Sequence, residues 1–336
     1  MLLNSDIAIS ITHNNFIRNK KSCVIHNLIE KKITSSYIHL NKENCILAAL
    51  SEYLEREVLI LKNHYIYGKE VEAYSLVDNK KTIIDRETIL EKRLFVDSCG
   101  MAAHKNSNFI IENALDEFIE RQSFIFNYLS KTPGENISFD FIKKIINIDN
   151  YFSSISFYNI SLIKGYFVIF AKGLINNQFH VGLGSSNDFT VALNKCIKEL
   201  YQCKNSYTYP IDKVDIINEK EFNYDVFFYS LDPLKVKKAY EYLDKGNLEF
   251  DYDIIYSNKL SLFDAVKKLN YVCKINPHIV VYNTKYLNSN IKVIQIIDLN
   301  WFPALLPYRY NTEVYDYVEK VMDRQLDRKC NFIPFP

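Results

Sequence analysis

The sequence predicts an α/β or α+β protein in which several helices pack against a substantial mixed sheet. Two observations support this class. Three stretches repeat apolar residues with the period of a helix, and short runs rich in β-branched and aromatic residues lie between and after them. The 336 residues include only eight glycines and eight prolines, and no Gly/Ser-rich or Pro-rich linker divides them. We therefore expect one continuous domain over residues 1–336.

The three periodic stretches are expected to form amphipathic helices. Each places its leucine, isoleucine and phenylalanine side chains on one broad face, which a helix in a globular domain buries. They cover residues 43–60, 107–129 and 188–203. Further helices are expected at 232–245, 260–273 and 312–328.

Strands are expected where valine, isoleucine, tyrosine and phenylalanine dominate a short run, as half-buried strands require. These runs are residues 74–78, 154–163, 165–175, 224–231, 278–283 and 291–299.

Charge and cysteine content exclude several classes of protein. The formal net charge is +1, so there is no electrostatic reason to expect nucleic acid or an anionic membrane as a partner. The seven cysteines are odd in number and form no C-x-x-C pair, which indicates reduced thiols and no zinc site. The N-terminus lacks the basic region of a signal peptide, and no apolar run is long enough to span a bilayer. We expect a soluble, cytoplasmic protein.

A repeated motif carries the candidate chemistry. ALSEYLER (49–56) and ALDEFIER (114–121) are identical at five of eight positions. On a helix the glutamates of each copy are three residues apart and share one face, and the third helix repeats this spacing. The residues concerned are Glu52 and Glu55, Glu117 and Glu120, and Glu199 and Gln202. Paired like charges destabilise a helix mildly, so each pair favours a compensating cation.

Two interpretations of the motif stay open. Glutamate and arginine are good helix formers, and the repeat is compatible with two solvated helix faces. Alternatively, carboxylates from several helices converge on one hard cation, for which Mg²⁺ is the natural candidate. A di-iron site would need Glu-x-x-His pairs, but the second position is Glu55, Glu120 or Gln202. Gly100, Gly182 and Gly184, which precede the second and third helices, are expected to let the backbone approach an anion.

The motifs together resemble the YcaO family. DSCGMAAHKNSNFIIENALDEFIERQ resembles its central signature, while NKENCILAALSEYLER and GLGSSNDFTVALNKCIKELYQ resemble its first and later ATP-binding helices. The final FIPFP resembles the proline-rich terminus of the azoline-forming branch. The resemblance implies a single YcaO-like domain with nucleotide-binding motifs over 35–205, the remainder of the domain over 206–330 and a proline-containing tail over 331–336.

The resemblance also implies an activity and its residues. YcaO cyclodehydratases use ATP to phosphorylate a backbone amide oxygen of a ribosomally made precursor peptide, after Cys, Ser or Thr attacks the amide carbonyl, and so form a thiazoline or oxazoline. By this likeness Glu52, Glu55, Glu117 and Glu120 hold Mg²⁺. Arg121, Glu199 and Gln202 contact ATP, and the C-terminal carboxylate of Pro336 assists proton transfer.

Partners follow from the same resemblance. We expect the precursor peptide, an E1-like or ThiF-like protein that binds its leader, and a flavin-dependent dehydrogenase as a further chain. Two alternatives stay open: a YcaO enzyme that makes another amide modification, such as a thioamide or amidine, and a non-catalytic docking subunit. The FIPFP end argues against the first. Ala48 and Phe109 depart from the family pattern and favour the second, whereas the intact glutamate pairs argue against it.

Overall fold

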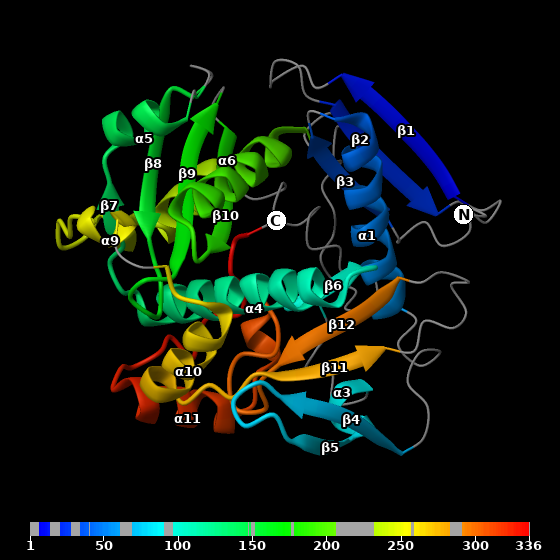
Figure 1. Ribbon diagram of the computed structural model, residues 1–336. Coiled ribbons are helices and arrows are strands. Elements are labelled where there is room, and N and C mark those ends of the chain that lie inside the picture. The colour runs from blue at the N-terminus through cyan, green and yellow to red at the C-terminus, as the bar shows by residue number, and fades with distance from the viewer. Residues whose placement is uncertain are drawn as a thin grey trace. The chain divides into compact units, whose positions relative to one another are not determined.

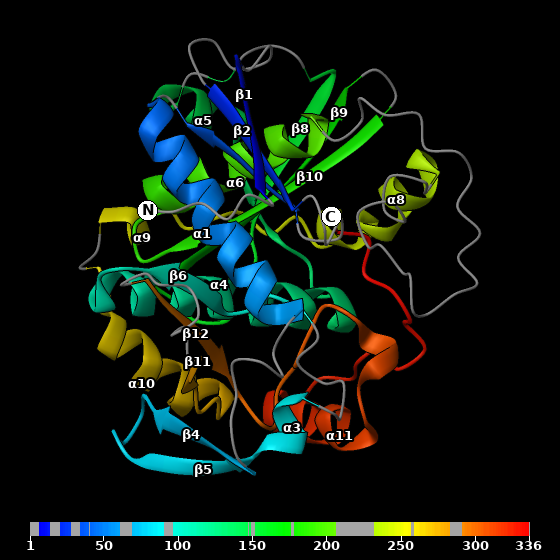
Figure 2. The same cartoon turned by 90° about the vertical axis from the view of Figure 1, so that its right-hand side faces the viewer.

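The computed structural model describes residues 7–13, 21–27, 34–39, 41–60, 69–90, 97–146, 148, 152–175, 178–205, 232–256, 259–282 and 291–335 (Figures 1 and 2). The chain divides into two compact units. The first unit comprises 1–122 and 261–324, and the second comprises 123–260 and 325–336. The expectation of one domain over 1–336 stays a prediction.

A small antiparallel sheet and the first helix form one part of the first unit. The sheet has the order β1-β2-β3. Its strands are β1 (Ile7–His13), β2 (Lys21–Asn27) and β3 (Thr34–His39). Helix α1 (Lys42–Ile60) packs against β2 and β3 and buries Cys45, Ala49 and Tyr53 in the shared core (Figure 1). The amphipathic pattern that predicts this helix thus faces a sheet.

The second sheet of this unit combines strands from distant parts of the sequence. Its order is β5-β4-β11-β12-β6, and all paired neighbours are antiparallel. The strands are β4 (Glu70–Ser75), β5 (Lys81–Asp85), β6 (Met101–His104), β11 (His278–Tyr282) and β12 (Lys292–Ile297). Helix α1 also packs against β6, which brings the first glutamate pair to that strand.

Side chains cap two of the remaining helices of the first unit. They are α3 (Arg86–Leu90), α10 (Leu262–Cys273), η4 (Pro307–Arg309) and α11 (Thr312–Met322). Ser261 and Asn311 accept the N-cap hydrogen bonds of α10 and α11. The long helix α4 (Ser107–Ser130) contributes residues up to Gln122 to this unit.

The second unit contains a four-stranded antiparallel sheet of order β10-β9-β8-β7. Its strands are β7 (Glu135–Ile137), β8 (Ser154–Asn159), β9 (Phe167–Ile175) and β10 (Gln178–Ser186). Its helices are α5 (Phe139–Ile145), α6 (Phe189–Asn205), α8 (Pro233–Ala239), η2 (Glu241–Asp244) and α9 (Asp253–Tyr256). Helix α6 lies across β10 and β9 (Figure 1).

The glycines before α6 serve packing. Gly182 and Gly184 lie inside β10, not in a loop that approaches an anion. A Cβ at Gly182 would lie 2.3 Å from the carbonyl oxygen of Cys196, and one at Gly184 would lie 2.3 Å from that of Ala192. The helix backbone therefore rests directly on the strand, which only glycine permits. The expectation that these two glycines let the backbone approach an anion is therefore wrong.

The mixed α/β class is confirmed. Elements that were expected have shifted ends, whereas strands β1, β2, β3, β5, β6, β7 and β10 were not expected. The run expected at 74–78 is the end of β4 followed by a turn, and the helix expected at 232–245 is α8 followed by η2. Helix α11 ends at Met322, earlier than expected. The strand expected at 224–231 lies outside the described residues. No helix within the described ranges is long and apolar enough to cross a membrane.

Candidate functional site

The first glutamate pair projects from α1 toward strand β6. Glu52 forms an ion pair with Arg56 one turn later, with 2.8 Å between carboxylate oxygen and guanidinium nitrogen. Glu55 is half-buried, and its Oε1 accepts a hydrogen bond of 2.8 Å from the backbone N–H of Ala103 in β6. One carboxylate of the pair therefore contacts an arginine and the other contacts strand backbone.

The second glutamate pair lies on α4 and shares one arginine. Arg121 Nε is 3.8 Å from Glu117 and 3.9 Å from Glu120. The exposed fractions of these side chains are small: 14% for Arg121, 26% for Glu117 and 10% for Glu120. Because partial burial weakens solvent screening, one guanidinium must balance two carboxylates in a low-dielectric setting.

The two pairs influence one another electrostatically. Burial, reinforced by the nearby carboxylate of Glu52, raises the pKa of Glu55 to about 8. Burial also raises the pKa of Glu117 well above its ordinary value, opposed by Arg121 but reinforced by Glu55. The carboxylates of α1 and α4 thus lie close enough to disfavour each other's charge. A divalent cation would relieve that repulsion.

A buried turn before β6 borders this cluster, and sequence reasoning missed it. Asp97 accepts hydrogen bonds from the backbone N–H groups of Cys99 (3.0 Å) and Leu305 (2.6 Å). Gln295, fully buried in β12, donates to the carbonyl oxygen of Cys99 at 3.0 Å. The turn is also close to the glutamate cluster, because a Cβ at Gly100 would lie 3.4 Å from the Cβ of Phe118, the residue after Glu117 on α4.

Gly100 completes this turn in the left-handed region, with φ of 70°. A Cβ there would lie 2.4 Å from the carbonyl oxygen of Ile296, and the N–H of Ile296 donates a hydrogen bond to the Gly100 carbonyl at 2.8 Å. The glycine expected to approach an anion therefore approaches strand β12. The turn could be suspected from the Asp-Ser-Cys-Gly order, but its partner Gln295 could not.

The other predicted site residues lie in the second unit or outside the described part. Glu199 on α6 is half-buried and accepts a hydrogen bond from the N–H of Leu183 at 2.6 Å. The side chain of Gln202 and the whole of Pro336 lie outside the described residues. The structure therefore brings together Glu52, Glu55, Glu117, Glu120 and Arg121. The roles of Glu199, Gln202 and Pro336 stay predictions.

The glutamate cluster is not arranged as a finished metal site. Across the residues that the structure describes, no group of three or more His, Cys, Asp and Glu side chains is close enough to hold a metal ion. The cause lies in the contacts above: Glu52 turns to Arg56, Glu55 to Ala103 and Glu117 to Arg121. The donor set still fits Mg²⁺, which is bound by few protein carboxylates and takes its remaining ligands from water and phosphate.

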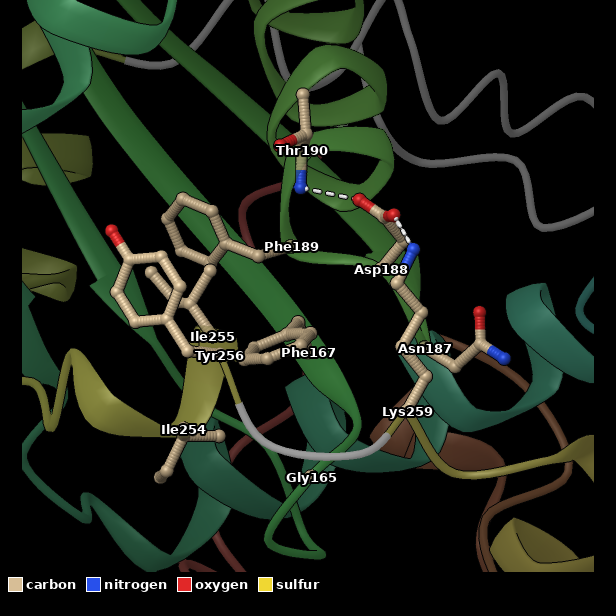
Figure 3. A pocket seen from close by; sticks show the side chains of 10 residues that line it. All are labelled: Gly165, Phe167, Asn187, Asp188, Phe189, Thr190, Ile254, Ile255, Tyr256 and Lys259. Carbon is tan, nitrogen blue, oxygen red and sulfur yellow. Dashed lines mark hydrogen bonds and ion pairs between the residues drawn. The ribbon is translucent and has the colours of Figure 1, made fainter.

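A separate pocket of about 270 Å³ opens in the second unit at the start of α6 (Figure 3). Aromatic and aliphatic side chains line one side, including Phe167, Phe189 and Tyr256, while Asp188 pairs with Lys259 on the other. None of the predicted site residues lines it. Glu199 is ten positions further along α6, about 15 Å along the helix axis.

The fold is that of the YcaO proteins. No family model matches the chain. Its structure is similar to YcaO from Methanopyrus kandleri, which was solved with AMPPCP and Mg²⁺. The TM-score is 0.64 at 12% identity, over 87% of this chain and 85% of that one. The resemblance to YcaO cyclodehydratases that the motifs indicate is confirmed.

Within this class the similarity extends to a microcin-processing protein. A chain of the E. coli microcin synthetase McbBCD complex with pro-MccB17 bound gives a TM-score of 0.70 at 18% identity, over 98% of this chain and 96% of that one. The microcin B17-processing protein McbD of Escherichia coli is 24% identical over 263 residues. That match covers 71% of this chain but only 63% of McbD, less than two thirds of the curated relative.

Proposed function

We propose that this chain is a YcaO-type cyclodehydratase subunit of a peptide-modifying synthetase. In this proposal it uses ATP to phosphorylate backbone amide oxygens of a ribosomally synthesised precursor peptide, converting Cys, Ser or Thr to thiazoline or oxazoline. The observation that carries the proposal is the geometry of the two glutamate pairs: Arg121 lies beside both Glu117 and Glu120 on α4, and Glu55 of α1 bonds to Ala103 in the strand that precedes α4. The likeness to McbD supports the azoline-forming branch.

The carboxylates of Glu52, Glu55, Glu117 and Glu120 would hold Mg²⁺, with phosphate oxygens of ATP as further ligands. Bound there, the metal would neutralise charge on the transferring phosphoryl group. Arg121 already lies between Glu117 and Glu120, so it can turn from the carboxylates to a phosphate without leaving the cluster. Glu199 and Gln202 on α6 are proposed as further nucleotide contacts.

The last residue of the sequence is proposed to supply the proton-transfer group. The carboxylate of Pro336 would accept the proton that the attacking thiol or hydroxyl releases, as a positioned base does. Pro334 and Pro336 each fix one backbone dihedral, which lowers the entropy lost when the segment is ordered.

The proposal includes partners. A leader-binding subunit of the E1-like or ThiF-like kind would present the precursor, and a flavin-dependent dehydrogenase would oxidise azolines to azoles. The solved McbBCD complex with pro-MccB17 is the precedent for such an assembly. A cytoplasmic location fits the absence of a disulfide among the six cysteines whose side chains the structure describes.

A non-catalytic docking subunit is the second candidate. The contacts that favour it are the ion pairs of Arg56 and Arg121, which balance part of the carboxylate charge without a metal. The alternative predicts that the chain neither binds Mg-ATP nor requires its glutamates in the assembled synthetase.

The test is a thermal-shift titration with Mg-ATP on the wild type and Glu117→Gln, with Glu43→Gln at the exposed start of α1 as the matched control. A ligand at 100 times its Kd adds about 2.7 kcal/mol to stability. We expect that shift in the wild type and the control, and its loss in Glu117→Gln. An equal shift in all three would show that Mg-ATP binds elsewhere.

The same variants then enter the synthetase reconstituted with its partner subunits and precursor. Mass spectrometry counts the loss of one water for each ring formed. Ring formation that survives Glu117→Gln, or an assembly in which the wild type binds no Mg-ATP, would favour the docking subunit over the enzyme.

A further inference from the structure

Strand β5 forms the outer edge of the five-stranded sheet. In the order β5-β4-β11-β12-β6 it is paired on one side only, as far as the described residues go (Figures 1 and 2). Its central residue, Ile83, is 59% exposed, and on the same face Tyr74 of β4 and Val281 of β11 are 43% and 51% exposed. Soluble proteins usually avoid large apolar side chains beside an open edge strand, because such an edge pairs with other chains. The edge is therefore a candidate interaction surface.

The ladder with β4 shows which backbone groups of β5 point outward. Hydrogen-bonded pairs in an antiparallel ladder recur at every second residue. At one end of this ladder the N–H of Ser75 donates to the Lys80 carbonyl at 2.9 Å. At the other end the N–H of Arg86 donates to the Lys69 carbonyl at 3.0 Å. The even-numbered residues of β5 therefore bond to β4, whereas the N–H and C=O groups of its odd-numbered residues point away from the sheet.

The side chains of these odd-numbered residues are self-complementary. They are Lys81, Ile83 and Asp85, and all three are exposed. Along the strand they are basic, apolar and acidic, so a second copy that runs antiparallel with its Ile83 opposite this one places Lys81 opposite Asp85 at both ends. Opposite charges on directly facing residues stabilise a sheet, whereas like charges destabilise it.

The backbone permits this register and the charges select it. Because the odd-numbered residues carry the outward groups, odd must face odd, and a two-fold axis at Ile83 meets that condition. Each facing pair can then exchange both of its hydrogen bonds. An axis at the neighbouring residue would place Lys81 or Asp85 opposite Ile83, so both ion pairs would be lost. A lysine on an edge strand ordinarily discourages pairing, but here it favours one partner in one register.

We propose that β5 is a homodimer interface, at which two copies of this chain pair their β5 edges antiparallel about Ile83 and extend the sheet across a two-fold axis. Lys81 already forms an ion pair with Glu72 on β4, so in the dimer it lies between that carboxylate and Asp85 of the second copy. The two Ile83 side chains cover each other at the axis, which removes apolar surface from water. The inference does not depend on the proposed function, because none of the glutamates of the candidate site lies on β4 or β5.

Sedimentation equilibrium of the full chain tests the dimer. The wild type should approach twice the monomer mass of 39.5 kDa as its concentration rises. Lys81→Asp and Asp85→Lys each place like charges opposite one another at both ends of the interface, so each variant alone should stay a monomer. Lys292→Asp is the matched control and should dimerise like the wild type, because this exposed lysine lies on β12, which β4 and β11 separate from β5. A wild type that is monomeric at every concentration overturns the proposal, and so does a dimer that survives both charge reversals.

Mixing the two variants tests the register. In a mixed pair the acidic side chains of Lys81→Asp face the lysines of Asp85→Lys at both ends, so a heterodimer should form although neither variant pairs with itself. This gain requires both variants to be folded, so a loss of stability cannot imitate it. A mixture that stays monomeric would overturn the pairing of Lys81 with Asp85.

Hydrogen exchange of the wild type measures the edge without any substitution. The outward N–H groups of β5 are open to solvent in a monomer and bonded in the dimer. Exchange in residues 81–85 should therefore slow about tenfold at a concentration where about nine-tenths of the chains are dimeric, because only the monomer exchanges these groups. Exchange in β12 should not change with concentration. A doubling of mass with unchanged exchange in residues 81–85 would mean that another surface forms the dimer, and would overturn the proposal.

Discussion

Glu55 on α1 and Ala103 on β6 are joined by a hydrogen bond of 2.8 Å in which a carboxylate of the candidate site accepts from strand backbone. Glu55 therefore has one oxygen that holds the fold together, while its carboxylate is also a proposed ligand of Mg²⁺. The bond also fixes the register between the helix that carries the first glutamate pair and the strand that precedes α4.

Replacing Glu55 separates these two roles. Glu55→Gln keeps an oxygen acceptor for Ala103, so its free energy of unfolding should stay within about 1 kcal/mol of wild type. Glu55→Leu leaves the backbone N–H of Ala103 without an acceptor and should lower the free energy of unfolding by about 2 kcal/mol. Urea unfolding measures both. Equal stability of the Gln and Leu variants would show that the bond adds nothing to the fold.

Because Gln295 and Tyr282 are hydrogen-bonded in the core, the effects of substituting them on stability should be coupled. The Tyr282 hydroxyl donates to Gln295 Oε1 at 2.7 Å, while Gln295 Nε2 donates to Cys99. Gln295→Leu should cost about 3 kcal/mol, because it leaves a hydroxyl and a carbonyl unpaired in the core. Adding Tyr282→Phe removes the orphan hydroxyl, so the double variant should be more stable than the sum of the single effects predicts. Strict additivity in the double-mutant cycle would contradict this coupling.

Acid should weaken the start of α6. Asp188 caps this helix by accepting from Thr190 N at 2.8 Å, and its ion pair with Lys259 lowers its pKa below the ordinary 3.8. The stability that this shift contributes is present above the ordinary value and is lost as pH falls through the lowered pKa. Asp188→Asn keeps the cap but does not titrate. Melting temperatures from about pH 5 to about pH 2 should therefore converge between wild type and variant; parallel curves would refute the linkage.

Gly184 in β10 should tolerate no side chain. A Cβ there would lie 2.3 Å from both Ala192 O and Cys196 N of α6, and backbone cannot move aside easily. Gly184→Ala should cost about 3 kcal/mol. Gly173→Ala in β9 is the matched control, because the three atoms nearest to its Cβ would all belong to the ring of Phe152, a side chain and not backbone. A smaller loss at Gly184 than at Gly173 in urea unfolding would show that α6 shifts freely over the sheet.

The sequence predicts the helices better than the sheets. Helices α1, α4 and α6 lie within about two residues of their expected ends, because each buries a continuous apolar face. Strand β1 was missed although Ile7, Ile9 and Ile11 alternate with small or polar residues, a pattern typical of a half-buried strand. Strand β10 was missed because glycine ordinarily marks a turn, whereas here it admits a helix backbone.

The candidate site also contains residues that could be predicted from the sequence and residues that could not. Four glutamates and Arg121 could be found because their spacing repeats on two helices. Asp97 and Gln295 could not be found from the sequence, because 198 residues separate them. Only the pairing of β12 with β6 brings Gln295 to the turn that begins at Asp97. Local patterns show which side chains share a helix face, but not which distant strand supports them.

The strand order of the five-stranded sheet has a consequence for biosynthesis. Strands β4 and β6 are made early, yet β11 and β12, which lie between them, come from residues 278–297. On the ribosome, β4 and β6 must wait for most of the chain to be translated, each with an unpaired edge open to aggregation. Residues 123–260, by contrast, form most of the second unit without interruption. Nascent chains should therefore acquire protease resistance in the second unit before the first, and slow translation beyond residue 260 should lower the yield of native protein.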